Sequence, residues 1–172
     1  MFLNYLKNFF TQKLVKKNLS NVKHSPNQFA IQTVGIVFDE SYFYEREALV
    51  QELVQNGIQE SNIKVLVYKD KIRKNEPFDY PVFSHKDLSW RATFDKSEVK
   101  DFVAHKFDLL INYYDVEKSA LLLVTNQSKA SFKVGFASID KKLNHFMIDT
   151  NAENYKVFVE ELFKYLKILN KI

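Results

Sequence analysis

The sequence predicts an α/β fold: a three-layer α/β/α sandwich around a mostly parallel sheet of five or six strands, a Rossmann-like half preceded by an amphipathic helix. Short apolar runs rich in β-branched residues alternate along the chain with segments whose apolar residues recur at helical spacing. The joints between them are short, as in the strand, helix, strand units that build parallel sheets. A chain of 172 residues, 46% hydrophobic and 15% aromatic, is long and apolar enough to bury one core.

The first 28 residues are predicted to be separate from the globular domain. Residues 1–20 form a basic amphipathic helix in this interpretation, because Leu3, Leu6, Phe10 and Leu14 fall on one helical stripe. Residues 21–28 lack periodicity and are expected to be a linker. We therefore divide the chain into a helix and linker, 1–28, and a single α/β domain, 29–172.

The domain is expected to open with a strand, a helix and a second strand. The apolar run 33–38 predicts the first strand, and Asp39, Glu40 and Ser41 are good residues for starting a helix. That helix should end at Gly57, because glycine adopts the left-handed cap conformation without steric cost. The run 63–68 predicts the second strand.

The second half of the domain continues the alternation after an irregular stretch. Residues 69–87 are expected to form a long surface loop, because they hold two prolines and a mixed-charge run. Further strands are predicted at 107–114, 131–137 and 146–148, and helices after residue 98, over 116–125 and after residue 153. The pairs Asp95 and Glu98, and Thr150 and Glu153, have the spacing of capping boxes at two of these helix starts.

Composition excludes several classes of function. The chain has no cysteine, so it has no disulfide, thiolate metal site or cysteine nucleophile. Its three glycines do not form a phosphate-binding loop, which argues against the usual nucleotide-binding modes. Apolar runs are too short for a membrane span, and lysines interrupt the start where a signal peptide needs an apolar run. We therefore expect a cytoplasmic protein, with attachment to the inner membrane face left open.

Three carboxylates follow predicted strands and form the candidate catalytic set. Asp39 and Glu40 come after the first strand and Asp115 after a central one. Ligands of parallel sheets bind beyond the carboxyl ends of strands, where converging carboxylates can hold Mg²⁺. The alternative is that Asp39 and Asp115 are simply caps of the helices that follow.

The positive charge of the chain is concentrated at its beginning. The first 38 residues hold five lysines and no acid, while the rest holds 20 basic residues against 21 acids. The candidate partner-binding residues are Lys7, Lys13, Lys16, Lys17, Phe9 and Phe10. Such a helix can lie on a membrane surface, contact RNA phosphates as a ribosome-bound factor does, or dock by its apolar stripe with its lysines in water.

Residues 107–140 resemble the amino-terminal domain of heptosyltransferase-type glycosyltransferases. The resemblance rests on Lys118, Ser119 and Ala120 at a helix start and on the run 133–136, Lys-Val-Gly-Phe. It implies a Rossmann-like half fold, and it departs from that family where Asp39 and Glu40 replace a glycine-containing turn. The sequence also lacks that family's second domain, so this resemblance implies catalysis only with a partner subunit. The whole chain is similar to an uncharacterised family of small α/β proteins of Bacteroidota.

These observations predict a non-enzymatic cytoplasmic binding or adaptor protein without a cofactor. It would attach through residues 1–20 to a protein partner, a membrane surface or the ribosome and its RNA. The alternative is an enzyme of sugar or phosphoryl transfer that uses Asp39, Glu40 and Asp115 with Mg²⁺.

Overall fold

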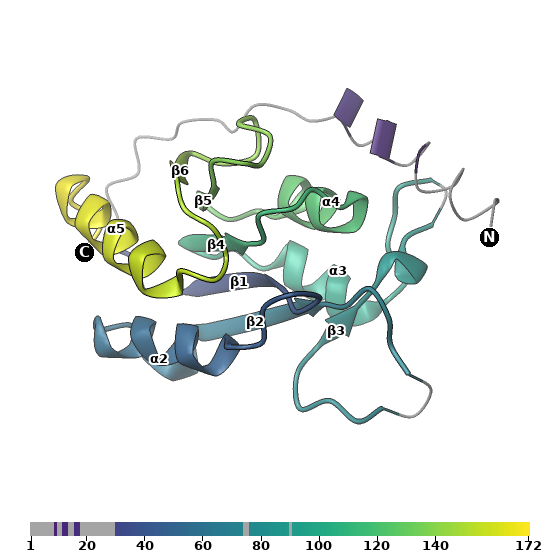
Figure 1. Ribbon diagram of the computed structural model, residues 1–172, viewed down its shortest axis with the longest axis horizontal. Coiled ribbons are helices and arrows are strands. Elements are labelled where there is room, and N and C mark those ends of the chain that lie inside the picture. The colour runs from purple at the N-terminus through teal and green to yellow at the C-terminus, as the bar shows by residue number, and fades with distance from the viewer. Residues whose placement is uncertain (1–8, 10–11, 14–15, 18–29, 74–75, 90) are drawn as a thin grey trace.

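The computed structural model describes residues 9, 12–13, 16–17, 30–73, 76–89 and 91–172 (Figure 1). In this part of the chain the strands are β1 (Val34–Asp39), β2 (Ile63–Tyr68), β3 (Val82–Phe83), β4 (Leu109–Tyr113), β5 (Phe132–Phe136) and β6 (Phe146–Ile148). The α-helices are α2 (Arg46–Gln55), α3 (Ser97–Ala104), α4 (Ser119–Gln127) and α5 (Tyr155–Ile168), and two short 3₁₀ turns are η1 (Glu60–Asn62) and η2 (His85–Asp87).

The six strands form one parallel sheet in the order β3-β2-β1-β4-β5-β6. Strand β1 pairs with β2 on one side and with β4 on the other, so the strand order reverses direction between β1 and β4. In open α/β sheets this reversal is the place where ligands bind. The predicted α/β fold with a parallel sheet is confirmed.

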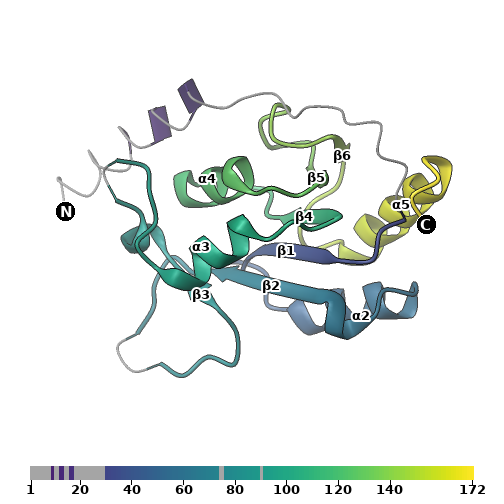
Figure 2. The ribbon, with the colours of Figure 1, turned by 180° about the vertical axis from the view of Figure 1, so that it is seen from behind.

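The helices cover both faces of the sheet. Helix α2 packs beside α5, and α3 packs beside α4. Views from opposite sides place the first pair on one face and the second pair on the other (Figures 1 and 2). This arrangement follows from right-handed crossovers that leave β1 in one direction and β4 in the other.

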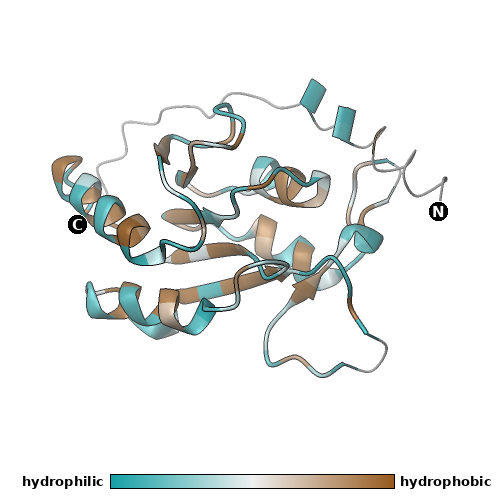
Figure 3. Cartoon of the chain, in the orientation of Figure 1, coloured by the Kyte–Doolittle hydropathy of each residue, from teal (hydrophilic) through white to brown (hydrophobic). Residues whose placement is uncertain are grey.

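The core is built from the central strands and a cluster of aromatic rings. All six residues of β1 and all five of β4 are buried, and Figure 3 colours the central strands mostly in the hydrophobic shade. Tyr113 lies within 5.1–5.4 Å, between ring centroids, of Phe38, Phe43, Phe136 and Phe158. The high aromatic content is therefore used largely in the core, where each ring removes a large apolar area from water.

The helix starts differ from those expected. Helix α3 has Lys96 as its N-cap and α5 has Asn154, and neither side chain makes a capping hydrogen bond. The capping boxes predicted at Asp95 and Thr150 were therefore wrong. A capping box does exist at Ser84 and Asp87, where it starts the turn η2. Gly57, by contrast, has φ of 99° directly after α2, as its predicted role requires.

The predicted surface loop 69–87 is only partly irregular. Its second half contains β3, which pairs with the end of β2, and the turn η2. The described residues of its first half project from the body beside β3 (Figure 1). A strand of two residues is too short to produce a readable alternation of apolar and polar residues, which explains why it was missed.

Candidate functional site

The candidate site lies at the carboxyl ends of β1, β2 and β4, where the strand order reverses. Asp39, Tyr68 and Tyr113 are the last residues of these strands. Three segments meet at this edge: the loop after β1, the loop after β2 and the start of α4. Lys118, before α4, contacts both loops. An open parallel sheet binds ligands at this position.

Lys118 is the centre of the site. Its Nζ lies 2.8 Å from Asp39 Oδ2 and 3.1 Å from Asp70 Oδ2, and it donates a hydrogen bond of 2.9 Å to Ser41 Oγ. The side chains of Lys118 and Asp39 are only 15% and 6% exposed, so this pair is largely removed from water. Lys118 thus connects the start of α4 to the loops after β1 and β2.

Asp39 is not the helix cap that the sequence predicted. The N-cap of α2 is Glu45, six residues later, and it makes no side-chain cap. Asp39 Oδ1 instead accepts a hydrogen bond of 3.0 Å from the backbone N–H of Ser41. The carboxylate therefore shapes its own loop and balances the charge of Lys118.

Two tyrosine rings flank the Lys118 ammonium group. Its Nζ lies 4.9 Å from the ring centroid of Tyr42 and 4.8 Å from that of Tyr68, within the range of cation–π attraction. Burial and the nearby Asp70 carboxylate raise the pKa of the Tyr68 hydroxyl far above its usual range. Burial alone would raise the pKa of Asp70, but hydrogen bonding and charge from Lys118 outweigh it and lower that pKa. At neutral pH the Tyr68 phenol is therefore protonated and the Asp70 carboxyl is ionised.

Glu40 belongs to a second group of contacts. Its carboxylate lies 3.0 Å from Lys69 Nζ and 3.5 Å from Arg46 Nη1, and it accepts hydrogen bonds of 3.1 and 3.2 Å from the Tyr80 hydroxyl. The Arg46 guanidinium also stacks over the Tyr80 ring at 3.5 Å. Glu40 therefore fastens the projecting loop and the start of α2 to the end of β1.

Asp115 has a third set of partners. Its Oδ2 accepts a hydrogen bond of 3.0 Å from the backbone N–H of Ala152, and its carbonyl oxygen accepts one of 2.8 Å from Ser138 Oγ. The N-cap of α4 is Lys118, so Asp115 is not the predicted cap either. It joins the end of β4 to the loops that follow β5 and β6.

The three candidate carboxylates thus hold separate partner groups. No group of three or more His, Asp or Glu side chains in the described part of the chain is arranged to hold a metal ion. The Mg²⁺ alternative therefore finds no ligand cluster among these residues.

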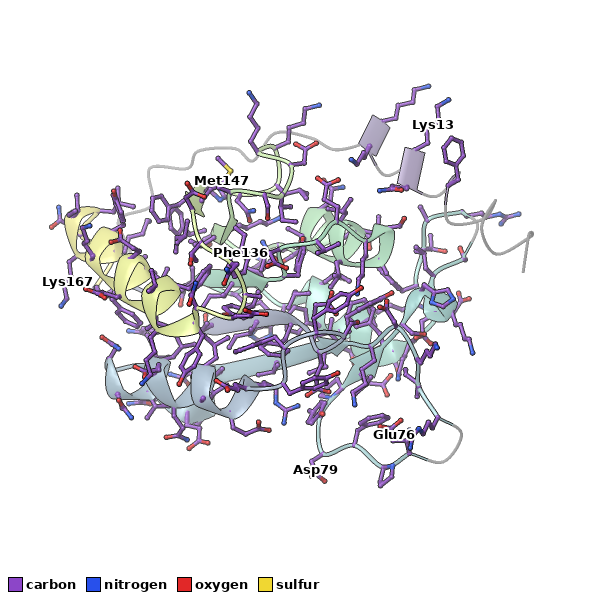
Figure 4. All side chains as sticks on the ribbon, viewed as in Figure 1. Lys13, Glu76, Asp79, Phe136, Met147 and Lys167 are labelled. Atoms are coloured by element: carbon purple, nitrogen blue, oxygen red, sulfur yellow. The ribbon has the colours of Figure 1, made fainter. Side chains whose placement is uncertain are left out.

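The described part of the N-terminal segment lies against this edge. Phe9, Gln12, Lys13, Lys16 and Lys17 have helical backbone conformation. Lys16 Nζ lies 2.5 Å from Oε2 of Glu117, the residue directly before Lys118 in the sequence. Phe9 is 51% exposed, and Lys13 and Lys17 are also exposed; Figure 4 labels Lys13 on this segment. The other two predicted partner-binding residues, Lys7 and Phe10, lie outside the described residues.

Three hollows run along the same edge. One of about 400 Å³ is lined by Gln12, Tyr68, Asp70, Lys71, His85, Glu117, Lys118, Ser119 and Ala120. One of about 270 Å³ is lined by Glu40, Ser41, Tyr44, Lys69, Asp70 and Lys71. One of about 320 Å³ is lined by Phe9, Gln12, Lys13 and Lys16. The largest hollow shares Asp70 and Lys71 with the second and Gln12 with the third.

The sequence interpretation missed the central role of Lys118. It noted this residue only as part of a resemblance, although a lysine that follows a strand end near two acidic strand ends is itself a signal for an ion pair. The exposed rings of Tyr42 and Tyr44, in the loop after β1, were also missed, because aromatic residues elsewhere in this chain are mostly in the core.

None of the described helices is both long and apolar enough to cross a membrane.

Comparisons with known proteins show the family to which the chain belongs. Searches of curated proteins and of solved structures found no match. A family model does match, over residues 7–169, and it describes a family of unknown function, DUF6913. Because the match extends from the basic segment to the last helix, the chain belongs to the DUF6913 family.

Proposed function

We propose that this protein is a non-enzymatic binding or adaptor protein that attaches to an anionic partner through its basic N-terminal segment. The partner classes are a protein, a membrane surface and the RNA of the ribosome, all of which can present the negative charge that the lysines would meet.

The observation that carries this proposal is that each of the three candidate carboxylates is already bonded to other groups of the protein. Asp39 balances Lys118, Glu40 balances Lys69 and Arg46, and Asp115 accepts a backbone hydrogen bond. A general base or a metal ligand must be able to reach a substrate or an ion, whereas these groups hold the protein's own loops together. Their arrangement supports a binding role over phosphoryl or sugar transfer.

Exposed lysines remain available at and near this edge of the sheet. Lys13, Lys17 and Lys71 are exposed and form no ion pair with the described residues. Lys13 and Lys17 belong to the segment that carries the excess positive charge of the chain. This supports an anionic partner at the edge of the sheet where that segment lies.

The test is a charge reversal in the full-length protein. We expect the double variant Lys13→Glu, Lys17→Glu to leave the lysate fraction that holds its partner and to appear as free protein, because like charges then repel the partner. The shift should be largest at low salt, since salt screens these contacts. Separate collection of membranes, ribosomes and soluble complexes identifies the partner class.

The double variant Lys156→Glu, Lys167→Glu is the matched control. Both lysines are exposed on α5, and the change in net charge is the same. Unchanged partitioning of the N-terminal variant, or an equal shift of the control, would contradict the proposal.

A thermal-shift screen separates this proposal from the enzymatic alternative. Ligands that bind the native state raise the melting temperature. We expect no stabilisation by Mg²⁺ with sugar nucleotides. A rise in melting temperature that the Asp115→Ala substitution abolishes would support the enzymatic alternative and contradict the adaptor proposal.

A further inference from the structure

The three hollows at the carboxyl edge share lining residues, and the surface that they make up together is called the track below. The hollow beside Tyr44 shares Asp70 and Lys71 with the largest one, and the largest one shares Gln12 with the hollow beside Phe9. The track therefore crosses from the loop after β1, past the start of α4, to the N-terminal segment. An elongated ligand could contact all three hollows at once.

Among the described residues, the lining of this track has an excess of positive charge. The acids among them are Glu40, Asp70 and Glu117, and each lies within an ion-pair distance of a lysine of the same lining: Lys69, Lys118 and Lys16. Lys13 and Lys71 remain, and both are exposed. The charge that this track can still neutralise is therefore negative.

Exposed aromatic rings accompany the lysines along the track. Tyr44 lines the hollow at one end and is 69% exposed, and Phe9 lines the hollow at the other end and is 51% exposed. The ring of Tyr42, also 69% exposed, lies 4.9 Å from Nζ of Lys118, which lines the largest hollow. Each of these exposed rings therefore has a lysine beside it: Tyr44 shares its hollow with Lys71, Phe9 shares its hollow with Lys13, and Tyr42 contacts Lys118.

We propose that this track binds a single strand of nucleic acid. Cations beside exposed aromatic rings are the chemistry of proteins that bind single strands without sequence preference, where lysines meet phosphates and rings stack on bases. A lipid surface is flat and would not follow a row of hollows, and an acidic peptide offers no planar base to each ring. The inference deepens the proposed function, and rests on it, by naming the class of the anionic partner.

The experiment is fluorescence anisotropy of the full-length protein with labelled oligouridylate and oligothymidylate. We expect binding that weakens as salt rises, because bound lysines release counterions from the phosphates. Tyr44→Ala should weaken binding roughly 5- to 100-fold, the loss expected for one stacked base, and Tyr44→Phe should restore it. Lys71→Ala should reduce the slope of log K against log salt by about 0.7, the value for one phosphate contact with a single strand.

Lys167→Ala is the matched control for Lys71→Ala. Figure 4 labels Lys13, on the track, and Lys167, on α5, at opposite ends of the view. Loss of this exposed lysine should leave both the affinity and the salt slope unchanged.

Three results would overturn the inference. The first is no change in anisotropy up to about 100 µM protein, the weak end of non-specific binding. The second is equal affinity for inorganic polyphosphate with no effect of Tyr44→Ala, and the third is binding to anionic vesicles but to neither oligonucleotide.

The two proposals can fail separately. If the double variant Lys13→Glu, Lys17→Glu alters partitioning while anisotropy does not change, the adaptor proposal stands and the nucleic-acid inference fails. If oligonucleotides bind and need Tyr44 but partitioning is unchanged, attachment through the N-terminal segment fails instead.

Discussion

Lys133 shows how much one buried side chain can cost. This residue of β5 is only 7% exposed, and its Nζ donates a hydrogen bond of 2.7 Å to the Thr125 carbonyl oxygen. It lies beside a buried hydrogen-bonded chain that runs from Tyr114 through Thr125 and Asn112 to Asn144. Burial lowers the pKa of Lys133 from 10.5 to about 8, because the charged form loses its hydration.

That shift gives a pH-dependent prediction for Lys133→Met. Between pH 8 and 10.5 the unfolded chain binds more protons at this residue than the folded chain, so wild-type stability rises with pH over that window. Below pH 8 the wild type bears the full cost of burying a charged lysine, on the order of 3 kcal/mol. The hydrogen bond from Lys133 to Thr125, which methionine cannot make, offsets part of that cost. We expect Lys133→Met to raise the free energy of unfolding by about 1–2 kcal/mol at pH 7.

Urea denaturation at pH 7 and at pH 10 checks this prediction. The advantage of the methionine variant should shrink at the higher pH, where the wild-type lysine is neutral in the folded state. A variant that is less stable than wild type at pH 7, or an advantage independent of pH, would contradict it.

At the scale of elements, Asp108 holds the start of β4 against the segment that leads into β1. Its Oδ2 accepts hydrogen bonds of 2.8 Å from both the backbone N–H and the Oγ1 hydroxyl of Thr33, and one of 3.1 Å from the Gln32 N–H. Burial opposes ionisation of this carboxyl, but these hydrogen bonds outweigh it and lower the Asp108 pKa from 3.8. The carboxylate thus sets the register in which the two central strands begin.

We expect Asp108→Asn to lower the free energy of unfolding by about 1–2 kcal/mol near pH 7, because a neutral amide accepts these hydrogen bonds more weakly. The folded-state pKa lies below the unfolded one, so the contribution is full above pH 3.8 and is lost as the pH falls below that value. Thermal melts between pH 7 and pH 3 should show the difference in stability between the variant and wild type becoming smaller.

The control is Asp79→Asn, on the projecting loop, where Figure 4 labels Asp79. This change should alter stability little. A loss equal to that of Asp108→Asn would contradict the role given to Asp108.

The elements also show what sequence reasoning can reach. Strands β2 and β6 begin and end at the residues predicted, because each is a short, mainly apolar run with a polar residue directly before and after it. Helix starts were predicted less well, since Lys96, Lys118 and Asn154 precede helices without a side-chain cap. A capping motif indicates a helix only where the side chain is used for capping, and spacing alone does not determine that.

At the scale of the whole molecule, Lys118 joins the two halves of the sheet. It follows β4, while its partner Asp39 ends β1 and its partner Asp70 follows β2. Lys118→Met would leave Asp39, 6% exposed, without its counter-charge. We expect a loss of about 2–4 kcal/mol in the free energy of unfolding, slightly below the usual cost of breaking a fully buried pair.

A double-mutant cycle with Asp39→Asn tests whether this contact acts as a pair. The two changes together should cost less than the sum of the single changes, by about 1–3 kcal/mol in urea denaturation. Additive losses would mean that Lys118 stabilises the protein through packing on its tyrosine rings and not through Asp39.

The sequence by itself determined the parallel α/β fold, the aromatic core and the concentration of positive charge at the beginning of the chain. These are sums over many residues, so local periodicity and composition are enough to reveal them. Only the tertiary structure decided that Asp39, Glu40 and Asp115 each bind a different part of the chain, and that Lys71, Tyr44 and Lys13 line one track. The physical reason is that ion pairs and hollows depend on side chains that meet across long sequence separations, such as the 79 positions between Asp39 and Lys118, and no local pattern records such a meeting.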